Sequence, residues 1–310
     1  MESIEILKTG AYLPKTKITS DEIEEKLKLE KGYIYKRTGI QTRYYAKESI
    51  EEMAIKAVQN LVEKIEDEKI INEIGLIIVA TTSPKNIMPG ISNEIQKRLK
   101  INKCISLDIL AGCSGYINAL DIAQMYLTTG KVKKALVIGV DKLTEYTKKE
   151  DIGTSIILAD GAGAILFENT NKDKKYISNI QAEIDENQIL TCKTDEKIQM
   201  KGKEIYKYAV TNTIENIKEL LQKSQENLED IKYLIPHQSN TKIMKSINTR
   251  LKLEEGKMFT NIEYVGNTFC ASIPIAINEM LENNLLQEKD KVILLGYGGG
   301  LNTGSILMEI

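Results

Sequence analysis

The segment that decides the fold of this chain reads Ser106-Leu-Asp-Ile-Leu-Ala-Gly-Cys-Ser-Gly-Tyr116. It begins as an apolar strand, turns at small residues and continues as a helical pattern to Gly130, a natural helix stop. Cys113 therefore lies at the start of a helix, facing unpaired backbone N–H groups and the positive end of the dipole. We expect this position to stabilise the thiolate, the nucleophilic form. The alternative is that Cys113 is a small buried core residue, and this is our interpretation of Cys104, Cys192 and Cys270.

Two further segments place polar side chains beside apolar runs. His237, in Leu234-Ile-Pro-His-Gln238, is the only histidine of the chain and follows a strand-like run. Asn267 lies between Gly266 and Thr268. A cysteine, a histidine and an asparagine suggest a nucleophilic thiol served by an imidazole and an amide. A structural histidine and a turn or N-cap asparagine are the alternatives. A single histidine excludes a His-rich metal site and any reaction that needs two imidazoles.

Composition limits the other functions. The chain has 310 residues, 42% hydrophobic and 28% charged, with a net charge of −2. This balance gives no electrostatic reason to expect nucleic acid. We expect no membrane span, because no apolar run reaches 18 residues, and no signal peptide at the acidic, strand-like N-terminus. The four cysteines form no Cys-x-x-Cys pair, so we expect no zinc site or disulfide framework but free thiols in a reducing cytoplasm.

Strand-like runs alternate with helical patterns along the whole chain, which predicts an α/β fold. Capping boxes at Thr19–Glu22 and Ser49–Glu52 predict two helix starts. The predicted strands are 75–80, 134–139, 163–167, 233–235, 291–295 and 304–310.

The two halves of the chain look alike. Strands 75–80 and 233–235 begin 158 residues apart, and strands 134–139 and 291–295 begin 157 apart. Cys113 and Asn267, 154 residues apart, each precede a helix. We infer an internal duplication that brings these helix starts together, with chance matching in an α/β chain as the alternative.

Two glycine-rich runs have separate interpretations. Gly296-Tyr-Gly-Gly-Gly-Leu301 follows a buried strand and is either a flexible turn or a source of N–H groups for an oxyanion hole. Asp160-Gly-Ala-Gly-Ala164 lacks the third glycine of a dinucleotide fingerprint, and no helix pattern follows it. We interpret it as a turn that enters a strand and do not expect NAD binding.

Seven motifs in order give a resemblance over nearly the whole chain. The sequence resembles the β-ketoacyl-acyl-carrier-protein synthase III family of the thiolase superfamily. The motifs are Arg37-Thr-Gly-Ile40, Val79-Ala-Thr-Thr-Ser83, Ala111-Gly-Cys-Ser-Gly115, Asp160-Gly-Ala-Gly-Ala164, Pro236-His-Gln238, Gly266-Asn-Thr268 and Gly298-Gly-Gly300.

The resemblance implies a duplicated, five-layered αβαβα fold and a homodimer. Its halves would be residues 1–170, with the cysteine, and 171–310, with the histidine and asparagine. It implies that Cys113 is the nucleophile, that His237 and Asn267 assist decarboxylation, and that the N–H groups of Cys113 and Gly299 form an oxyanion hole. Met88 falls at the position whose side chain, in members of the family, enters the acyl pocket of the partner subunit.

The sequence departs from the family at the expected coenzyme A contacts. Family members that take coenzyme A clamp its adenine between a Trp and an Arg. In this chain those two positions are Tyr33 and Ile152, and Arg37 is a further expected substrate contact. Tyr33 can stack, whereas Ile152 supplies no guanidinium. The stretch 183–200, which resembles a tunnel-covering loop, is also shorter than in the family. A basic patch for carrier protein is partly kept, as Lys207, Lys242 and Arg250.

We therefore predict a cytoplasmic condensing enzyme without metal or redox cofactor. It would load an acyl thioester on Cys113, from acyl-coenzyme A or a carrier protein, and join it to malonyl-acyl carrier protein to start fatty-acid synthesis. Three alternatives remain: a specialised-metabolism condensing enzyme or acyltransferase of the same fold, a papain-like cysteine hydrolase, and an inactive binding module of thiolase fold. Against the hydrolase, the chain has no Trp and Cys113 lies far from the N-terminus.

Overall fold

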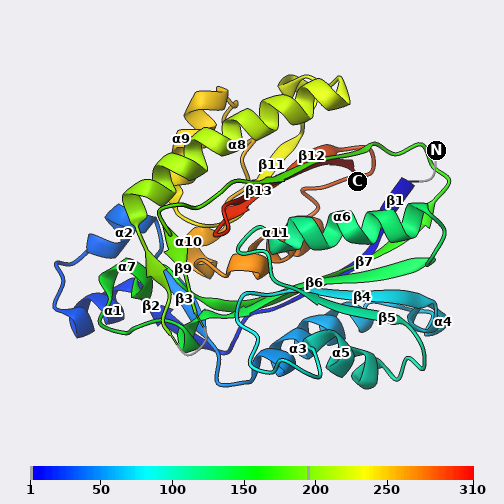
Figure 1. The fold of residues 1–310 in the computed structure, drawn as a ribbon, viewed down its shortest axis with the longest axis horizontal. Coiled ribbons are helices and arrows are strands. Elements are labelled where there is room, and N and C mark those ends of the chain that lie inside the picture. The colour runs from blue at the N-terminus through cyan, green and yellow to red at the C-terminus, as the bar shows by residue number, and fades with distance from the viewer. Residues whose placement is uncertain (1–2, 194–195) are drawn as a thin grey trace.

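The computed structural model describes residues 3–193 and 196–310. Met1 and Glu2, which begin the predicted N-terminal strand, and Thr194 and Asp195, within the 183–200 stretch, lie outside the described residues. Two main sheets and three helical layers make up the fold, beside two small two-stranded sheets, and Figure 1 shows the helices above, between and below the main sheets.

The larger sheet has five strands in the order β1-β7-β6-β4-β5. Strands β1 and β7 and strands β7 and β6 pair antiparallel, whereas β4 is parallel to both β6 and β5. The strands are β1 (Ser3–Tyr12), β4 (Ile74–Ala80), β5 (Ile105–Ile109), β6 (Lys134–Lys142) and β7 (Asp160–Thr170).

The smaller sheet repeats this pattern in the second half. Its order is β11-β12-β13-β8, with β8–β13 and β13–β12 antiparallel and β12–β11 parallel. An isolated parallel bridge from Leu234 to Met258 lies where a fifth strand would continue. The strands are β8 (Tyr176–Ala182), β11 (Tyr233–Pro236), β12 (Lys291–Gly298) and β13 (Asn302–Glu309). The strands of the two sheets have the same order and the same relative directions, which confirms the predicted duplication. The predicted boundary between the halves, at residue 170, falls at the end of β7.

Six helices form the three helical layers. Helices α6 and α11 lie between the sheets, α3 and α5 cover the outer face of the larger sheet, and α8 and α9 cover that of the smaller sheet (Figure 1). These helices are α3 (Ile50–Val62), α5 (Ile91–Leu99), α6 (Gly115–Thr128), α8 (Gly202–Ser224), α9 (Thr241–Leu251) and α11 (Ser272–Glu282). This is the predicted αβαβα architecture.

Shorter elements complete the chain. They are β2 (Thr16–Thr19), β3 (Thr42–Tyr45), β9 (Leu190–Thr191), β10 (Gln199–Met200), α1 (Ser20–Leu27), α2 (Tyr33–Thr38), α4 (Lys69–Asn72), α7 (Ile152–Ser155), α10 (Ile262–Val265) and the 3₁₀ turns η1 (Leu143–Glu145), η2 (Leu228–Asp230) and η3 (Phe269–Ala271). Thr19 and Ser49 cap α1 and α3 through the predicted capping boxes.

One local prediction was wrong. Asp160–Ala164 is the first part of strand β7, not a turn before it. The reason is close packing: a Cβ on Gly163 would lie 2.8 Å from the backbone nitrogen of Ile275 and from the Cβ of Pro274. The glycines thus let the central helix α11 approach the sheet, and α11 carries the segment that follows Asn267.

Among the described residues, no helix combines the length and the apolar character needed to cross a bilayer.

Candidate active site

Cys113 lies where the larger sheet meets the central layer. It follows β5 and precedes the N-cap Ser114 of α6, and its side chain is buried. Gly112 adopts φ +59°, and Gly298 at the end of β12 lies so close that an added Cβ would be 3.0 Å from the Sγ of Cys113. Both glycines are therefore needed to bring the second half of the chain against the thiol.

The electrostatic surroundings of Cys113 contradict one expectation. Burial raises the pKa of the Cys113 thiol well above its ordinary value, and the charge of Asp141 raises it further. The backbone N–H groups of Gly299 and of Cys113 itself act in the opposite direction and lower the pKa only in part. The prediction that the helix start stabilises a thiolate is wrong for the free enzyme, because desolvation outweighs these two donors. The thiol needs a base.

His237 follows β11 and is buried with 1% of its surface exposed. Its backbone N–H donates to the carbonyl of Leu295 at 2.7 Å, which fixes the residue to the end of β12. Its Nδ1 lies 2.7 Å from the Oγ of Ser272 on α11. Burial lowers the pKa of His237 to about 3, so the imidazole is neutral near pH 7 and can accept a proton.

The amide of Asn267 is oriented at both ends. Its Oδ1 accepts from the backbone N–H of Phe269 at 3.1 Å, and its Nδ2 donates to the carbonyl of Ser239 at 3.3 Å. Its backbone N–H donates to the carbonyl of Ile157, and its carbonyl accepts from the N–H of Ala159. An Asn Nδ2 carries two hydrogens, so one remains for a ligand.

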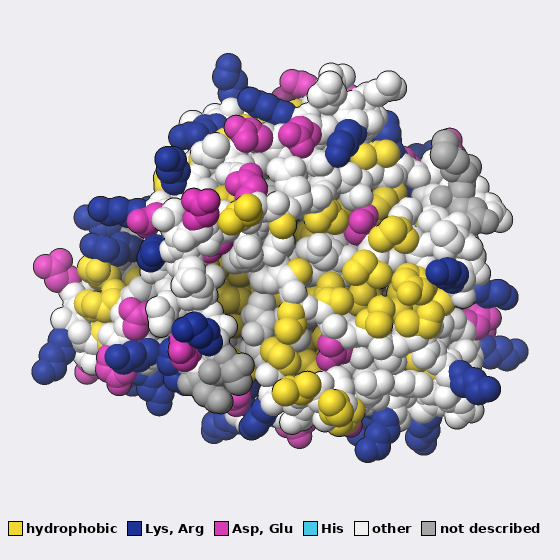
Figure 2. Space-filling model, viewed as in Figure 1, with side chains coloured by type: hydrophobic (Ala, Val, Ile, Leu, Met, Phe, Trp, Pro, Cys, Tyr) yellow, Lys and Arg dark blue, Asp and Glu magenta, His cyan; other side chains and the backbone are white. Residues whose placement is uncertain are grey.

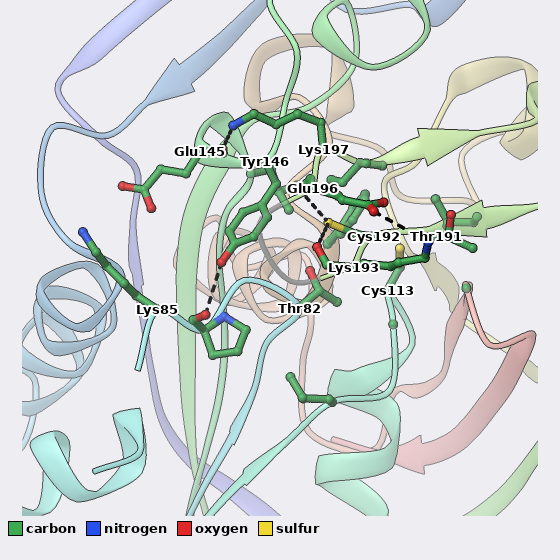
Figure 3. Close-up of a pocket in the computed structure, with 18 residues that line it drawn as sticks. Thr82, Lys85, Cys113, Glu145, Tyr146, Thr191, Cys192, Lys193, Glu196 and Lys197 are labelled. Atoms are coloured by element: carbon green, nitrogen blue, oxygen red, sulfur yellow. Dashed lines mark hydrogen bonds and ion pairs between the residues drawn. The ribbon is translucent and has the colours of Figure 1, made fainter. Parts of the chain in front are cut away.

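Two cavities meet at Cys113. The smaller, of about 120 Å³, is lined by Cys113, His237 and Asn267 and runs toward α8 and α9. The larger, of about 700 Å³, is also lined by Cys113, and Figure 3 shows Cys113 at one side of it near Cys192, with Lys85 at the opposite side and Tyr146 between them. The three polar side chains predicted from separate motifs thus share one cavity, and Cys113 also lines the second, larger one.

Sequence reasoning missed two aromatic residues of this site. Phe269 lines both cavities, and Tyr297 lines the smaller one. Their rings meet His237 edge-on, with centroid distances of 6.3 Å for Phe269 and 5.5 Å for Tyr297. The hydroxyl of Tyr297 also lies 2.7 Å from the Oγ of Ser239. Their positions, two residues after Asn267 and inside the Gly296–Leu301 run, are the signal that could have found them.

The predicted outer contacts do not line either cavity, although the carbonyl of Arg37 accepts a hydrogen bond from Asn240, which lines the smaller one. The guanidinium of Arg37 stacks 4.2 Å above the ring centroid of Tyr33 on α2, and Ile152 begins α7 with 37% exposure. Met88 is 82% exposed on the loop that follows Lys85 of the larger cavity. None of these four residues lines either of the two cavities, so their roles stay predictions.

The three predicted basic residues are exposed on the outer helices. Lys207 lies on α8, and Lys242 and Arg250 lie near opposite ends of α9. The two helices are joined by a 2.6 Å hydrogen bond between Tyr206 and Ser246. Figure 2 shows Lys and Arg side chains gathered at the left of the molecule, over α2 and the start of α8.

The described residues include no group of three or more His, Cys, Asp or Glu side chains placed to hold a metal ion. All four cysteines are free thiols, and Cys270 is buried as expected. The prediction of a buried core cysteine is wrong for Cys192, which is exposed because it lies on a surface segment that lines the larger cavity, and Cys104 is only half-buried.

The repeated sheets, with two central helices starting beside one buried cysteine, define a condensing enzyme of thiolase fold. Comparisons with known proteins agree. Models of 3-oxoacyl-[acyl-carrier-protein (ACP)] synthase III match residues 107–185 and, for its C-terminal part, 221–310. The β-ketoacyl-[acyl-carrier-protein] synthase III of Clostridium novyi is 35% identical over 100% of this chain and 99% of its own.

Solved structures show the same similarity. The 3-oxoacyl-[acyl-carrier-protein] synthase III of Aquifex aeolicus has a TM-score of 0.95 and 34% identity over 99% of this chain and 100% of its own. The Thermus thermophilus synthase has a TM-score of 0.93 and 29% identity, with 98% of both chains covered. The chain belongs to the β-ketoacyl-[acyl-carrier-protein] synthase III family, and the predicted class, an acyltransferase that condenses acyl groups in fatty-acid biosynthesis, is confirmed. The alternative that the chain is a papain-like cysteine hydrolase is excluded.

Proposed function

We propose that Cys113 is the residue that carries the acyl group, and that His237 and Asn267 serve it. The observation that carries this proposal is the shared cavity of the three side chains. Because the thiol is not ionised at rest, His237 takes its proton as the sulfur attacks the acyl thioester. The acyl chain then occupies the larger cavity, and the leaving thiol departs through the smaller one.

Condensation follows in the same cavity. A malonyl thioester enters with its carbonyl oxygen toward the free Nδ2 hydrogen of Asn267 and toward His237 with its proton on Nε2. These neutral donors stabilise the negative charge that develops on the oxygen as CO₂ leaves. The resulting carbanion attacks the acyl carbon on Cys113 and forms a 3-oxoacyl product. The N–H groups of Cys113 and Gly299, which act on the sulfur in the free enzyme, would bind the oxyanion of this second attack.

The substrates of this chain are, by the same proposal, an acyl-coenzyme A or acyl-carrier-protein donor and a malonyl-acyl carrier protein. Lys207, Lys242 and Arg250 offer positive charge to an acidic carrier beside the smaller cavity. Tyr33 and Arg37 stack together on α2 and offer an aromatic and cationic surface to an adenine. The reaction uses no metal or redox cofactor, and four free thiols suit a reducing cytoplasm.

We also propose a homodimer. Ile87, Met88 and Leu110 are 95%, 82% and 69% exposed, close to the edge strand β5, which pairs only with β4. Figure 2 shows hydrophobic side chains gathered in the middle and right of the face that it presents. Such a patch and an open sheet edge are features that a second copy would cover. It would also close the larger cavity, which Leu110 and Lys85 line. Sedimentation analysis of wild type and Met88→Glu tests this, since a monomeric wild type would contradict it.

The experiment that tests the reaction compares acyl loading with malonyl-dependent condensation. Purified enzyme is given an acyl thioester alone, and then with malonyl-acyl carrier protein. We expect a covalent acyl group on the protein in the first case and a 3-oxoacyl product with released CO₂ in the second. Turnover of acyl groups without malonyl substrate would instead support the acyltransferase alternative.

A further inference from the structure

Ser272 links His237 to the backbone of α11 through one hydroxyl group. Its Oγ lies 2.7 Å from Nδ1 of His237 and 2.8 Å from the carbonyl oxygen of Phe269. Both distances are those of hydrogen bonds. A carbonyl oxygen can only accept, and a serine has a single hydroxyl hydrogen, so that hydrogen lies between Ser272 and Phe269. The hydrogen of the other bond must then sit on Nδ1.

This chain of donors determines which ring nitrogen is free. With Nδ1 protonated and turned toward α11, Nε2 of the neutral imidazole carries a lone pair and is left for the cavity that His237 shares with Cys113. Ser272 and His237 are 2% and 1% exposed, so bulk solvent does not compete for these hydrogen bonds. Phe269 also donates its backbone N–H to Asn267, so the same short turn anchors both polar residues of the site.

We propose that Ser272 is a positioning residue that holds His237 in the Nδ1–H tautomer in the free enzyme, so that Nε2 can take the proton of the Cys113 thiol. The inference rests on the proposed function. In the step, the S–H bond of Cys113 breaks and an Nε2–H bond forms. The sulfur bonds to the acyl carbon as the carbon–sulfur bond of the donor thioester breaks. The departing sulfur takes the proton from Nε2, which restores the starting tautomer.

The same hydroxyl can serve the second half-reaction. Once Cys113 carries an acyl group, it has no proton to give, and a donor rather than a base is needed. A hydroxyl can donate to Nδ1 as readily as it accepts from it. When its hydrogen turns from Phe269 to Nδ1, the imidazole hydrogen belongs on Nε2, and the pair still holds two hydrogens. A side chain without a hydroxyl could support neither arrangement.

The test uses the fact that His237 is the only histidine of the chain. Full-length enzyme without a polyhistidine tag is labelled with ¹⁵N-histidine, so a long-range ¹H–¹⁵N spectrum shows a single imidazole. At neutral pH we expect wild type to show a protonated Nδ1 and an unprotonated Nε2. In Ser272→Ala the Nδ1–H loses its buried acceptor, so the ratio of the two tautomers moves toward Nε2–H by about five- to a hundredfold. The acyl-loading rate falls with it, and decarboxylation falls less.

Two variants separate this role from a general loss of structure. Ser272→Thr keeps the hydroxyl and should restore both the tautomer and acyl loading. Ser224→Ala is the matched control, because Ser224 is also buried and donates its hydroxyl to the carbonyl three residues earlier, Leu221, far from the site. It should leave the spectrum and the rates unchanged. A protonated Nε2 in wild type, or an unchanged spectrum in Ser272→Ala, would overturn the proposal. A His237→Gln enzyme that loads and condenses normally would instead remove the proposed function and leave the spectral result standing.

Discussion

A methyl group at position 298 is the most direct steric test of how the two halves meet at the thiol. In Gly298→Ala the new Cβ would lie 2.8 Å from the backbone nitrogen and the Cβ of Cys113, and 3.0 Å from its Sγ. Carbon atoms pack at about 3.5–4.0 Å, so the gap must open by roughly 0.7 Å or more. A misplacement of about 1 Å near reacting atoms can cost ~10²-fold in rate. We therefore expect acyl loading to fall by about ten- to a hundredfold.

The assay is the rate at which the protein gains the acyl mass, measured by intact-protein mass spectrometry at saturating donor. Gly256→Ala is the control, because its Cβ would meet no atom within 4 Å while its φ of +84° strains the chain. That strain costs about 1 kcal/mol of stability. The control should unfold at a lower temperature and load normally. If Gly298→Ala also loaded at the wild-type rate, the close approach of β12 to Cys113 would not be needed for the reaction.

Three other predictions follow from the site. Asn267→Ala should lose about 10²–10³ in condensation rate and keep acyl loading, as single-turnover assays of each half-reaction would show; normal condensation would refute the donor role. The unfolding free energy of wild type should fall by up to ~1.4 kcal/mol per pH unit below pH 6.5, because the unfolded chain binds a proton that folded His237, with a pKa of about 3, does not. Denaturant titrations at pH 4–8 should show a smaller slope in His237→Gln, and equal slopes would contradict the burial argument. Ile152→Arg should strengthen coenzyme A binding about two- to thirtyfold without helping a carrier-protein donor, because it supplies a cation for the adenine. Loading kinetics without a gain would contradict the clamp argument and would leave Arg37, stacked on Tyr33, as the cation.

Much of the fold could be predicted because its signals are local and repeated. The apolar runs 75–80 and 233–235 became β4 and β11, which hold equivalent places in two sheets of the same order. The capping boxes at Thr19 and Ser49 start helices as expected, since each is complete within four residues. Equal spacing of such elements was enough to infer that the two central helix starts meet.

The state of the thiol could not be predicted in the same way. The sequence shows that Cys113 precedes a helix, and that fact alone favours a thiolate. It does not show that Asp141, in a distant strand, lies close enough to raise the pKa, or that the side chain is desolvated. These are tertiary effects, and they reverse the expectation for the free enzyme.

The residues that support the site were missed for a related reason. Phe269 adopts φ +45°, an unusual conformation for a non-glycine residue, and this turn directs its N–H to Asn267 and its carbonyl to Ser272. No local sequence pattern predicts such a turn. From the sequence, Ser272 is interpreted as an ordinary residue at the start of a helix. Only the position of His237 in the fold shows that its hydroxyl has a chemical partner.

The central claim is that Cys113 alone receives the acyl group. Intact-protein mass spectrometry after exposure to acyl-coenzyme A and acyl-carrier-protein donors, followed by peptide mapping, measures this directly. We predict the mass gain of one acyl group, located on Cys113 and absent in Cys113→Ala. A label on Cys104, Cys192 or Cys270, or an acylated Cys113→Ala protein, would contradict the account.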